Sequence, residues 1–350
     1  MNASDLGFNA EKMKAMSTNN TIIASDEGHP RVDVWRASNE ATAGYAPEQI
    51  DELRQALTGV TKYVPAVFLY DDLGSAIGDE IVDAKSYYLA RKECELLDRH
   101  NEDIARLTVS PLVVELGSGS GKKNAGLLRS VQQQHSALYY MPNDINEKLM
   151  YEGAQVFADM LPGARIRCLA GTFEQAIQEV VHATEIPKLF MLLGSTISQL
   201  DDFSLLRFWR SQVSKGDQIL IAFDLVKDPE IVKAAYSNSE TQRHSANALM
   251  SLNRSFAGDF DPNAFEFVVR YHSELSRNET HQRSLKDQVV RLEALGLEAH
   301  FAKGETIRTA YQRKFVLDDV TAQTEAIGLF PIARFTDEQD WYALVLFEAG

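Results

Sequence analysis

The residues best suited to chemistry form a glycine-rich turn after a short β-branched run. Gly117, Ser118, Gly119 and Gly121 make up the turn, and Glu115 precedes it near the end of the run. Glycine lets the backbone adopt positive φ angles and approach a ligand without a Cβ atom in the way. A buried strand that passes through such a turn into a helix typically cradles a nucleotide. The pattern therefore predicts a site for an adenosine cofactor.

The glycine spacing separates two classes of nucleotide site. A dinucleotide fingerprint is G-x-G-x-x-G, and Lys122 stands where its third glycine would be. This chain has G-x-G-x-G, with Glu115 before the turn and Asp144 at the end of the next apolar run. A carboxylate at that place accepts hydrogen bonds from both ribose hydroxyls. The pattern favours S-adenosylmethionine over a nicotinamide cofactor. The structural alternatives are a plain tight turn and a helix N-cap role for Asp144.

A second group of candidate cofactor residues follows the third apolar run. Gly171, Thr172 and Phe173 come directly after Ala170. Ligands of parallel sheets bind at the carboxyl ends of the strands, so these residues are expected beside the adenine. Phe173 is equally compatible with ordinary core packing.

Apolar runs alternate with helical stretches between Pro111 and Asp224. Such alternation predicts βαβ units, and therefore a mainly parallel sheet with helices on both faces. The runs are 112–116, 137–141, 166–170, 189–193 and 218–223. A helix at 320–328 and strands at 330–335 and 342–347 suit the closing antiparallel hairpin of a methyltransferase sheet. The predicted fold class is α/β, a Rossmann-like class I methyltransferase sheet.

The remaining segments have a different rhythm, which predicts a second α+β substrate-binding domain inserted into the sheet domain. Helices are expected at 47–57 and 86–98 before the sheet region and at 230–236 and 245–256 after it, followed by alternating runs near 266–270 and 281–292. The stretch with Tyr70 and Gly74 is expected to be a loop. The predicted domains are an N-terminal extension (1–45, with an ordered piece near 32–36), a substrate-binding domain (46–92 plus 228–315) and an S-adenosylmethionine-binding methyltransferase domain (93–227 plus 316–350).

Composition excludes several classes of protein. The net charge of −15 is spread over 350 residues, which disfavours a nucleic-acid partner. Two cysteines, Cys94 and Cys168, exclude a disulfide scaffold and a cysteine-rich metal site. The histidines show no ligand spacing with carboxylates, so no metal is expected. No apolar run is long enough to span a bilayer, and the first 30 residues lack a signal-peptide core. We expect a cytoplasmic enzyme, monomeric or weakly oligomeric, without a membrane partner.

Several distinct motifs are spread along the chain, each at one place. They are FLYDDLGSAIGDEI (68–81), YYLARKE (87–93), VVELGSGSG (113–121), LLGSTISQL (192–200), FDLVKD (223–228), DFDPNAFEF (259–267) and IRTAYQRKF (307–315). Together they resemble the amino-acid α-N-methyltransferases, a family that includes L-histidine Nα-methyltransferase of ergothioneine biosynthesis and fungal dimethylallyltryptophan N-methyltransferases. A match distributed over so much of the chain is more specific than any single motif.

The resemblance implies roles for individual residues. Tyr70 and Tyr87 would flank the reacting amine as catalytic residues, and Tyr236 would hold the substrate carboxylate. Lys123 and Gly194 would line the cofactor together with the glycine loop. Each tyrosine alone would be read as a half-buried packing residue. Their joint placement inside matching motifs favours the functional interpretation.

Four positions depart from the family pattern. Gln199 stands where the family has an asparagine that binds the substrate carboxylate and amine. Ala310 and Gln312 replace a glutamate and a serine that recognise imidazole in the histidine-specific members, and Thr280 replaces a methionine that packs on the ring. A buried polar contact of this kind is worth about 1 to 3 kcal/mol. Losing the carboxylate and enlarging the pocket favours a bulkier aromatic amino acid, with tryptophan ahead of tyrosine and histidine demoted.

The expected activity is S-adenosylmethionine-dependent α-N-methylation of a free aromatic amino acid. Repeated methylation of the same amine, up to the trimethyl betaine, is compatible with this activity. In-line transfer to an amine depends mainly on proximity and alignment. Tyr70 and Tyr87 would orient the amine through their hydroxyls while water takes its proton. The alternatives are histidine Nα-methylation with Gln312 supplying the missing contact, a nicotinamide-dependent oxidoreductase, and a non-catalytic protein that binds an amino acid or a partner.

Overall fold

A computed structural model of the chain describes residues 32–37, 45–200 and 203–350. These residues form two compact units, and each unit is assembled from segments that are distant in sequence. Unit 1 contains residues 32–37, Arg91–Leu225 and Phe315–Gly350. Unit 2 contains residues 45–90 and Val226–Lys314. Both segments of unit 2 therefore lie, in sequence, between segments of unit 1.

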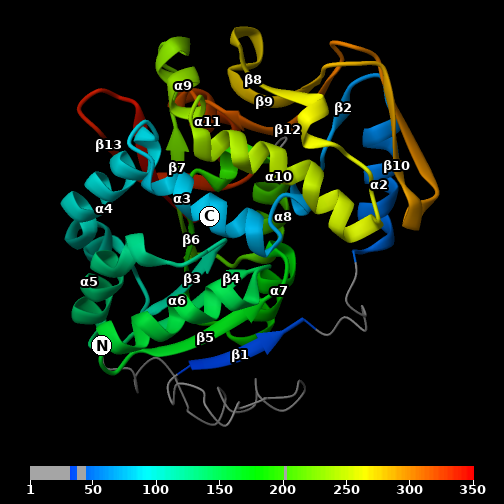
Figure 1. Cartoon of the computed structure of the whole chain (residues 1–350). Helices are drawn as coiled ribbons and strands as arrows, with labels where there is room; N and C mark the ends of the chain where they lie inside the picture. The colour runs from blue at the N-terminus through cyan, green and yellow to red at the C-terminus, as the bar shows by residue number, and fades with distance from the viewer. Residues whose placement is uncertain (1–31, 38–44, 201–202) are drawn as a thin grey trace. The chain divides into compact units, whose positions relative to one another are not determined.

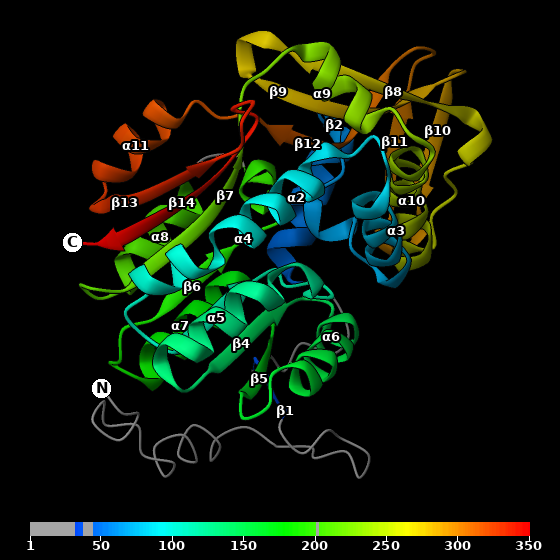
Figure 2. The same cartoon turned by 90° about the vertical axis from the view of Figure 1, so that its left-hand side faces the viewer.

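Unit 1 is built on an eight-stranded sheet with the order β1-β5-β4-β3-β6-β7-β14-β13. The strands from β1 to β7 in that order pair in parallel, and β14 and β13 continue the sheet as an antiparallel hairpin (Figure 2). Their bounds are β1 (Val32–Arg36), β3 (Leu112–Leu116), β4 (Tyr139–Asp144), β5 (Arg165–Ala170), β6 (Leu189–Leu192), β7 (Gln218–Asp224), β13 (Leu329–Thr336) and β14 (Tyr342–Ala349). The predicted α/β class, the parallel sheet and the closing hairpin are confirmed.

Helices cover both faces of this sheet (Figure 1). On one face the rings of Trp209 and Phe190 lie edge to face with their centroids 5.2 Å apart, within a core that α7, α8 and α11 share with the strands. On the other face Phe157 of α6 meets Tyr140 of β4 at 5.3 Å. The helices of unit 1 are α4 (Tyr88–Leu107, which begins within unit 2), α5 (Ala125–His135), α6 (Glu147–Met160), α7 (Phe173–Ala183), α8 (Ser204–Gln212) and α11 (Leu317–Glu325). Parallel strands buried on both faces need this cover.

Unit 2 combines a four-stranded sheet, of order β2-β12-β9-β8, with the hairpin β10-β11. Helix α10 packs against β8, β9 and β12, and also against α3. Leu53, Phe68, Leu249 and Ile307 lie in the core that results. The elements are α2 (Pro47–Thr58), β2 (Lys62–Tyr63), α3 (Asp72–Asp83), α9 (Pro229–Tyr236), α10 (Ser239–Phe256), β8 (Phe265–His272), β9 (Arg277–Ser284), β10 (Gln288–Leu292), β11 (Leu297–Phe301) and β12 (Thr306–Arg313). Among the described residues, no helix has the length and apolarity that a membrane span requires.

The expected loop around Gly74 is wrong, because this stretch forms helix α3. Asp71 caps the helix, and its carboxylate accepts a 2.8 Å hydrogen bond from Gly74 N. A Cβ at Gly74 would lie 1.9 Å from the Leu69 carbonyl oxygen, so only glycine fits there. Two glycines lower the helix propensity of the segment. Packing against α10 supplies the stability that the local sequence lacks.

The N-terminal segment contributes to the sheet. Within the predicted extension 1–45, residues Val32–Arg36 form β1, which pairs in parallel with β5 at the edge of the sheet. The ordered piece expected there is thus a strand of unit 1. The rest of the extension, residues 1–31 and 38–44, lies outside the described residues.

Candidate cofactor and substrate sites

The glycine loop leaves β3 with its backbone in the left-handed region. Gly117 has φ 68° and Gly119 has φ 52°. A Cβ at Gly119 would meet no atom within 4 Å, whereas one at Gly117 would touch the Phe173 ring at 3.4 Å. The loop therefore exposes backbone at Gly119, where a ligand can approach closely.

Asp144 at the end of β4 holds this loop. Its Oδ2 accepts a 2.9 Å hydrogen bond from Gly119 N, and its Oδ1 accepts one of 2.9 Å from Asn146 N. The N-cap of α6 is Asn146, whose side chain accepts from Leu149 N at 3.1 Å. Asp144 is thus not the helix cap. Its carboxylate is fixed beside the exposed glycine backbone, as a ribose ligand would require.

The residues after β5 have distinct surroundings. Thr172 is the N-cap of α7 and forms a capping box with Gln175. Gly171 N donates to the Asp144 carbonyl at 3.3 Å, which ties this turn to the end of β4. Phe173 packs partly on the large core of unit 1 and partly against Gly117. The packing role and the proposed adenine contact are therefore compatible for this ring.

Glu93 organises the same end of the sheet, and the sequence did not single it out. The fully buried carboxylate accepts hydrogen bonds from Lys123 Nζ (2.9 Å), Gly194 N (2.8 Å) and Tyr342 Oη (2.6 Å). It thereby joins α4, the glycine-loop lysine, the turn after β6 and strand β14. The available signal was an acid within the apolar stripe of α4, because Leu89, Leu96 and Leu97 are also buried.

Glu115 is enclosed in strand β3. Its carboxylate accepts hydrogen bonds from Tyr140 Oη and Asn124 Nδ2. Burial raises the pKa of Glu115 to about 7, against the opposing effect of these donors. The residue expected to contact the cofactor is thus also a brace between β3, β4 and the start of α5.

Glu115→Gln is expected to stabilise the protein increasingly as the pH rises from about 5 to about 8. Unfolded Glu115 ionises near its ordinary pKa of 4.5, whereas the folded carboxyl keeps its proton up to about pH 7. Folding therefore takes up a proton in this window, and the wild type loses stability as the pH rises through it. The full shift corresponds to about 3 kcal/mol.

Urea unfolding across this pH range measures the effect. Glu102→Gln, which alters an exposed glutamate of α4, is the control. A stability difference between wild type and Glu115→Gln that does not change with pH would contradict the account.

Buried serine hydroxyls test whether this edge of the sheet fits a polar cofactor. The Oγ atoms of Ser118, Ser195 and Ser198 are buried and have no hydrogen-bond partner among the described residues. Buried polar atoms are nearly always paired in native proteins. Ser195 also adopts a left-handed φ of 58° beside Gly194 (φ 69°), a strained conformation for a non-glycine residue. Unpartnered hydroxyls beside open glycine backbone fit a polar nucleoside such as S-adenosylmethionine.

Two of the three substrate tyrosines lie together in unit 2. The rings of Tyr87 and Tyr236 meet edge to face at 5.7 Å. Tyr236 is buried, and its Oη accepts a 3.2 Å hydrogen bond from Lys314 Nζ. Tyr70 instead has its ring 5.8 Å from that of His244. Gln199 is half-buried in a short 3-10 helix, Thr196–Gln199, and belongs to unit 1.

Three of the four positions that depart from the family pattern, Thr280, Ala310 and Gln312, share one face of the small sheet. Thr280 and Ala310 are directly paired across β9 and β12. Gln312 pairs with Asn278 two residues further on, and its Oε1 accepts a 3.0 Å hydrogen bond from Asn278 Nδ2. The register shifts by one residue between Arg308 and Ala310, so that Arg308 pairs with His281 and Ala310 with Thr280. Strand alternation therefore places side by side the residues that are predicted to contact the side chain of the substrate.

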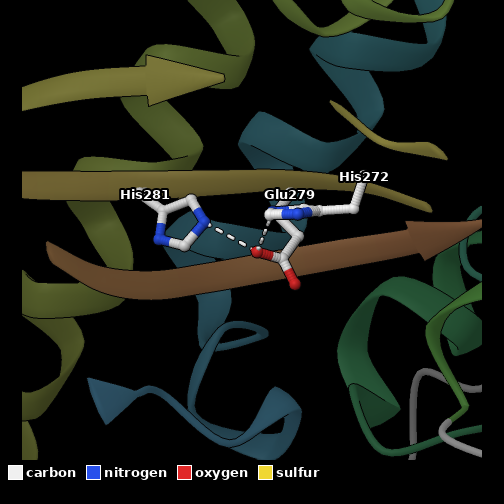
Figure 3. Close-up of side chains that lie close together, drawn as sticks. All are labelled: His272, Glu279 and His281. Carbon is white, nitrogen blue, oxygen red and sulfur yellow. Dashed lines mark hydrogen bonds and ion pairs between the residues drawn. The ribbon is translucent and has the colours of Figure 1, made fainter. Parts of the chain in front are cut away.

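On the opposite face of this sheet, Glu279 lies between His281 and His272 (Figure 3). Glu279 Oε2 lies 2.9 Å from His281 Nε2 and 3.1 Å from His272 Nε2, and Oε1 pairs with Arg277 and Arg308. Burial alone would raise the pKa of Glu279. The hydrogen bond from His281 and the charge of Arg277 outweigh it and lower the pKa to about 2.

These three side chains have the geometry of metal ligands, which their sequence spacing did not indicate. The carboxylate is, however, already matched by two guanidinium groups, and a cation would have to approach both. The arrangement is best described as a buried ion-pair network.

Comparison with known proteins agrees with this geometry. Residues 49–349 match the model of a family described as histidine-specific, SAM-dependent methyltransferases. The histidine N-alpha-methyltransferase of Mycobacterium tuberculosis is 32% identical over 84% of this chain and 93% of its own length. The corresponding protein of Mycolicibacterium smegmatis is 30% identical over the same shares. The L-tryptophan methyltransferase of Psilocybe serbica is 23% identical over 83% of this chain and 89% of its own length. The chain therefore belongs to the family of histidine-specific, S-adenosylmethionine-dependent methyltransferases and is an amino-acid N-methyltransferase.

Proposed function

We propose that this enzyme methylates the α-amine of a free aromatic L-amino acid, with tryptophan favoured over tyrosine. The observation that carries the proposal is the neutral face of β9 and β12. Asn278, Thr280 and Gln282 on β9 share it with Ala310 and Gln312 on β12. The nearest carboxylate along β9 is Glu279, which strand alternation directs to the other face. An imidazole N–H would find no carboxylate acceptor among these residues.

Aromatic and apolar side chains extend the same face onto β8. Val269 pairs with Thr280, Phe267 with Gln282, and Tyr271 with Asn278. These half-buried side chains offer the contact area that a large ring requires. The combination of apolar surface and neutral hydrogen-bonding groups supports an indole better than a charged or small side chain.

We assign cofactor binding and substrate binding to different units. We assign the cofactor to unit 1, through Glu115, the glycine loop, Lys123, Asp144, the turn at Gly171–Phe173, and Gly194. We assign the amino acid mainly to unit 2. Within unit 2, Tyr236 binds the substrate carboxylate in this proposal. Product mass would report whether one, two or three methyl groups are added, the last giving a betaine.

Tyr70 and Tyr87 orient the amine in this mechanism. S-adenosylmethionine supplies an activated methyl group on a sulfonium, so the protein needs only to present a neutral amine in line with it. The tyrosine hydroxyls hold the amine by hydrogen bonds, and water accepts its proton. Replacing both tyrosines by phenylalanine is expected to lower kcat by about 100-fold or more, in the range of orientation and acid–base effects. Full turnover by the double variant would contradict the assigned role.

Ala310→Glu is expected to move specificity towards histidine. The new carboxylate would stand beside Thr280 and could accept an imidazole N–H. A contact worth about 1 to 3 kcal/mol corresponds to a gain of roughly 5- to 150-fold in kcat/KM for histidine. The kcat/KM for tryptophan should fall. Steady-state kinetics with both amino acids measures the change, and Ala310→Gln serves as a matched variant without the charge. An unchanged ratio of histidine to tryptophan activity would contradict the assignment of this face.

Histidine is the alternative substrate. The observation in its favour is that the relatives at 30% and 32% identity are named histidine N-alpha-methyltransferases. In that case Gln312, whose side chain lies on the same face, would replace the missing carboxylate as the imidazole partner. Wild-type kinetics with histidine and tryptophan distinguish the two proposals.

A further inference from the structure

His244 on α10 is a buried hydrogen-bonding group that no described residue satisfies. Its ring is partly exposed, but Nε2 is buried and has no hydrogen-bond partner among the described residues. The ring lies 5.8 Å from Tyr70, the residue assigned to the substrate amine. The sequence spacing of His244 indicates no metal-ligand role. The structure instead places it beside a proposed catalytic side chain.

Two further unpartnered atoms belong to the elements around His244. Thr241 Oγ1 lies one helical turn earlier on α10, and Asn278 Oδ1 lies on β9. Helix and strand are joined through Ser245, whose Oγ accepts from Gln282 Nε2 at 3.0 Å and lies 2.6 Å from Thr309 Oγ1. Ser245, Gln282 and Thr309 thus satisfy one another. The unpartnered atoms stand out because buried polar groups are nearly always paired.

The protonation state of His244 fits a neutral ligand. Burial lowers the pKa of His244 to about 4, although the nearby charge of Asp71 acts in the opposite direction. Asp71 itself is engaged by Gly74 N, Asn247 and Arg254. At neutral pH the imidazole is therefore uncharged and offers one donor and one acceptor nitrogen. A neutral ring N–H or phenolic O–H matches this set.

We propose that His244 is a specificity-determining residue that accepts a hydrogen bond from the polar ring atom of the substrate side chain. The substrate class would then be aromatic amino acids whose ring carries an N–H or O–H group. The inference rests on the proposed function and refines it, because phenylalanine and other rings without a donor are disfavoured. Sites built to bond a substrate donor reject analogues that lack it, since the buried acceptor is left unpaired.

Matched substrate pairs test this role. Each pair differs in the ring donor: tryptophan and 3-benzothienylalanine, tyrosine and phenylalanine, histidine and 4-thiazolylalanine. We expect the wild type to prefer the donor-bearing member of whichever pair it methylates by roughly 10-fold or more in kcat/KM. His244→Phe should reduce that ratio to about 1, mainly by raising KM for the donor-bearing member. His244→Gln should restore part of the ratio, because its amide oxygen can accept the hydrogen bond.

Several results would overturn the inference, and they differ from failure of the proposed function. A wild-type ratio near 1 overturns it even if no variant folds. An unchanged ratio in His244→Phe also overturns the inference, because Nε2 would then bond to water and not to the substrate. This result would leave the proposed methylation of aromatic amino acids unaffected. If no pair is methylated, the proposed function fails; calorimetric binding of the pairs in the presence of S-adenosylhomocysteine then tests His244, and equal affinities overturn its role. Unchanged melting temperature and S-adenosylhomocysteine affinity establish that the variants are folded.

Discussion

Asp144→Ala should weaken S-adenosylhomocysteine binding by roughly 100-fold. The carboxylate accepts hydrogen bonds from Gly119 N and Asn146 N, and so fixes the glycine loop relative to α6. Its loss removes the two charge-assisted hydrogen bonds that the ribose hydroxyls donate to Asp144 in this proposal. Charge-assisted bonds are worth about 1.5 to 3 kcal/mol each, and about 3 kcal/mol in total corresponds to 100-fold in Kd. Isothermal titration calorimetry with purified protein measures the change.

Two variants sharpen this test. Asp144→Asn keeps the shape and one acceptor oxygen, so its affinity should lie between those of wild type and alanine variant. Glu152→Ala alters an exposed acid of the neighbouring helix α6 and should bind normally. Binding by Asp144→Ala within about threefold of wild type would remove Asp144 from the cofactor site.

Glu93→Gln should destabilise the protein by about 3 kcal/mol. The substitution leaves the Lys123 ammonium without its counter-charge and one of three donors without an oxygen. Breaking a buried ion pair typically costs 3 to 5 kcal/mol, and the lower end applies because the Lys123 side chain is 29% exposed. At about 2 to 4 °C per kcal/mol, the melting temperature should fall by roughly 6 to 12 °C.

Glu95→Gln is the matched control, because Glu95 is exposed on the same helix and pairs with Lys92 only at the surface. Such pairs contribute at most about 1 kcal/mol. Because Glu93 also holds Gly194 N, its variant should lose cofactor affinity as well. Equal stability of the two variants in urea would show that Glu93 is not the organising group described above.

The sheet of unit 1 was predictable because its local signals agree with its tertiary role. The apolar run Leu112–Leu116 predicts a buried strand, and the glycines that follow it predict a turn at its end. Helix α3 was not predictable, because Gly74 and Gly78 weaken its helical signal and contact with α10 stabilises it. Local pattern fixes an element only where packing does not override it.

The site residues differ in the same way. Asp144 was found because its position after a strand carries information. Glu93 and His244 were not, since a charged or titratable residue on a helix looks like a surface residue until its neighbours are known. The ion-pair network around Glu279 depends on cross-strand register, which the sequence of β9 and β12 does not reveal.

The most direct test of the proposed substrate is product analysis with the purified enzyme, S-adenosylmethionine and separate samples of tryptophan, tyrosine and histidine. Mass spectrometry identifies each methylated product, and initial rates give kcat/KM for each amino acid. We expect α-N-methylated tryptophan to be the product formed most efficiently, with methylated tyrosine second. Methylation of histidine alone would contradict the substrate assignment built on Ala310 and Thr280, and the absence of any methylated aromatic amino acid would contradict the proposed function itself.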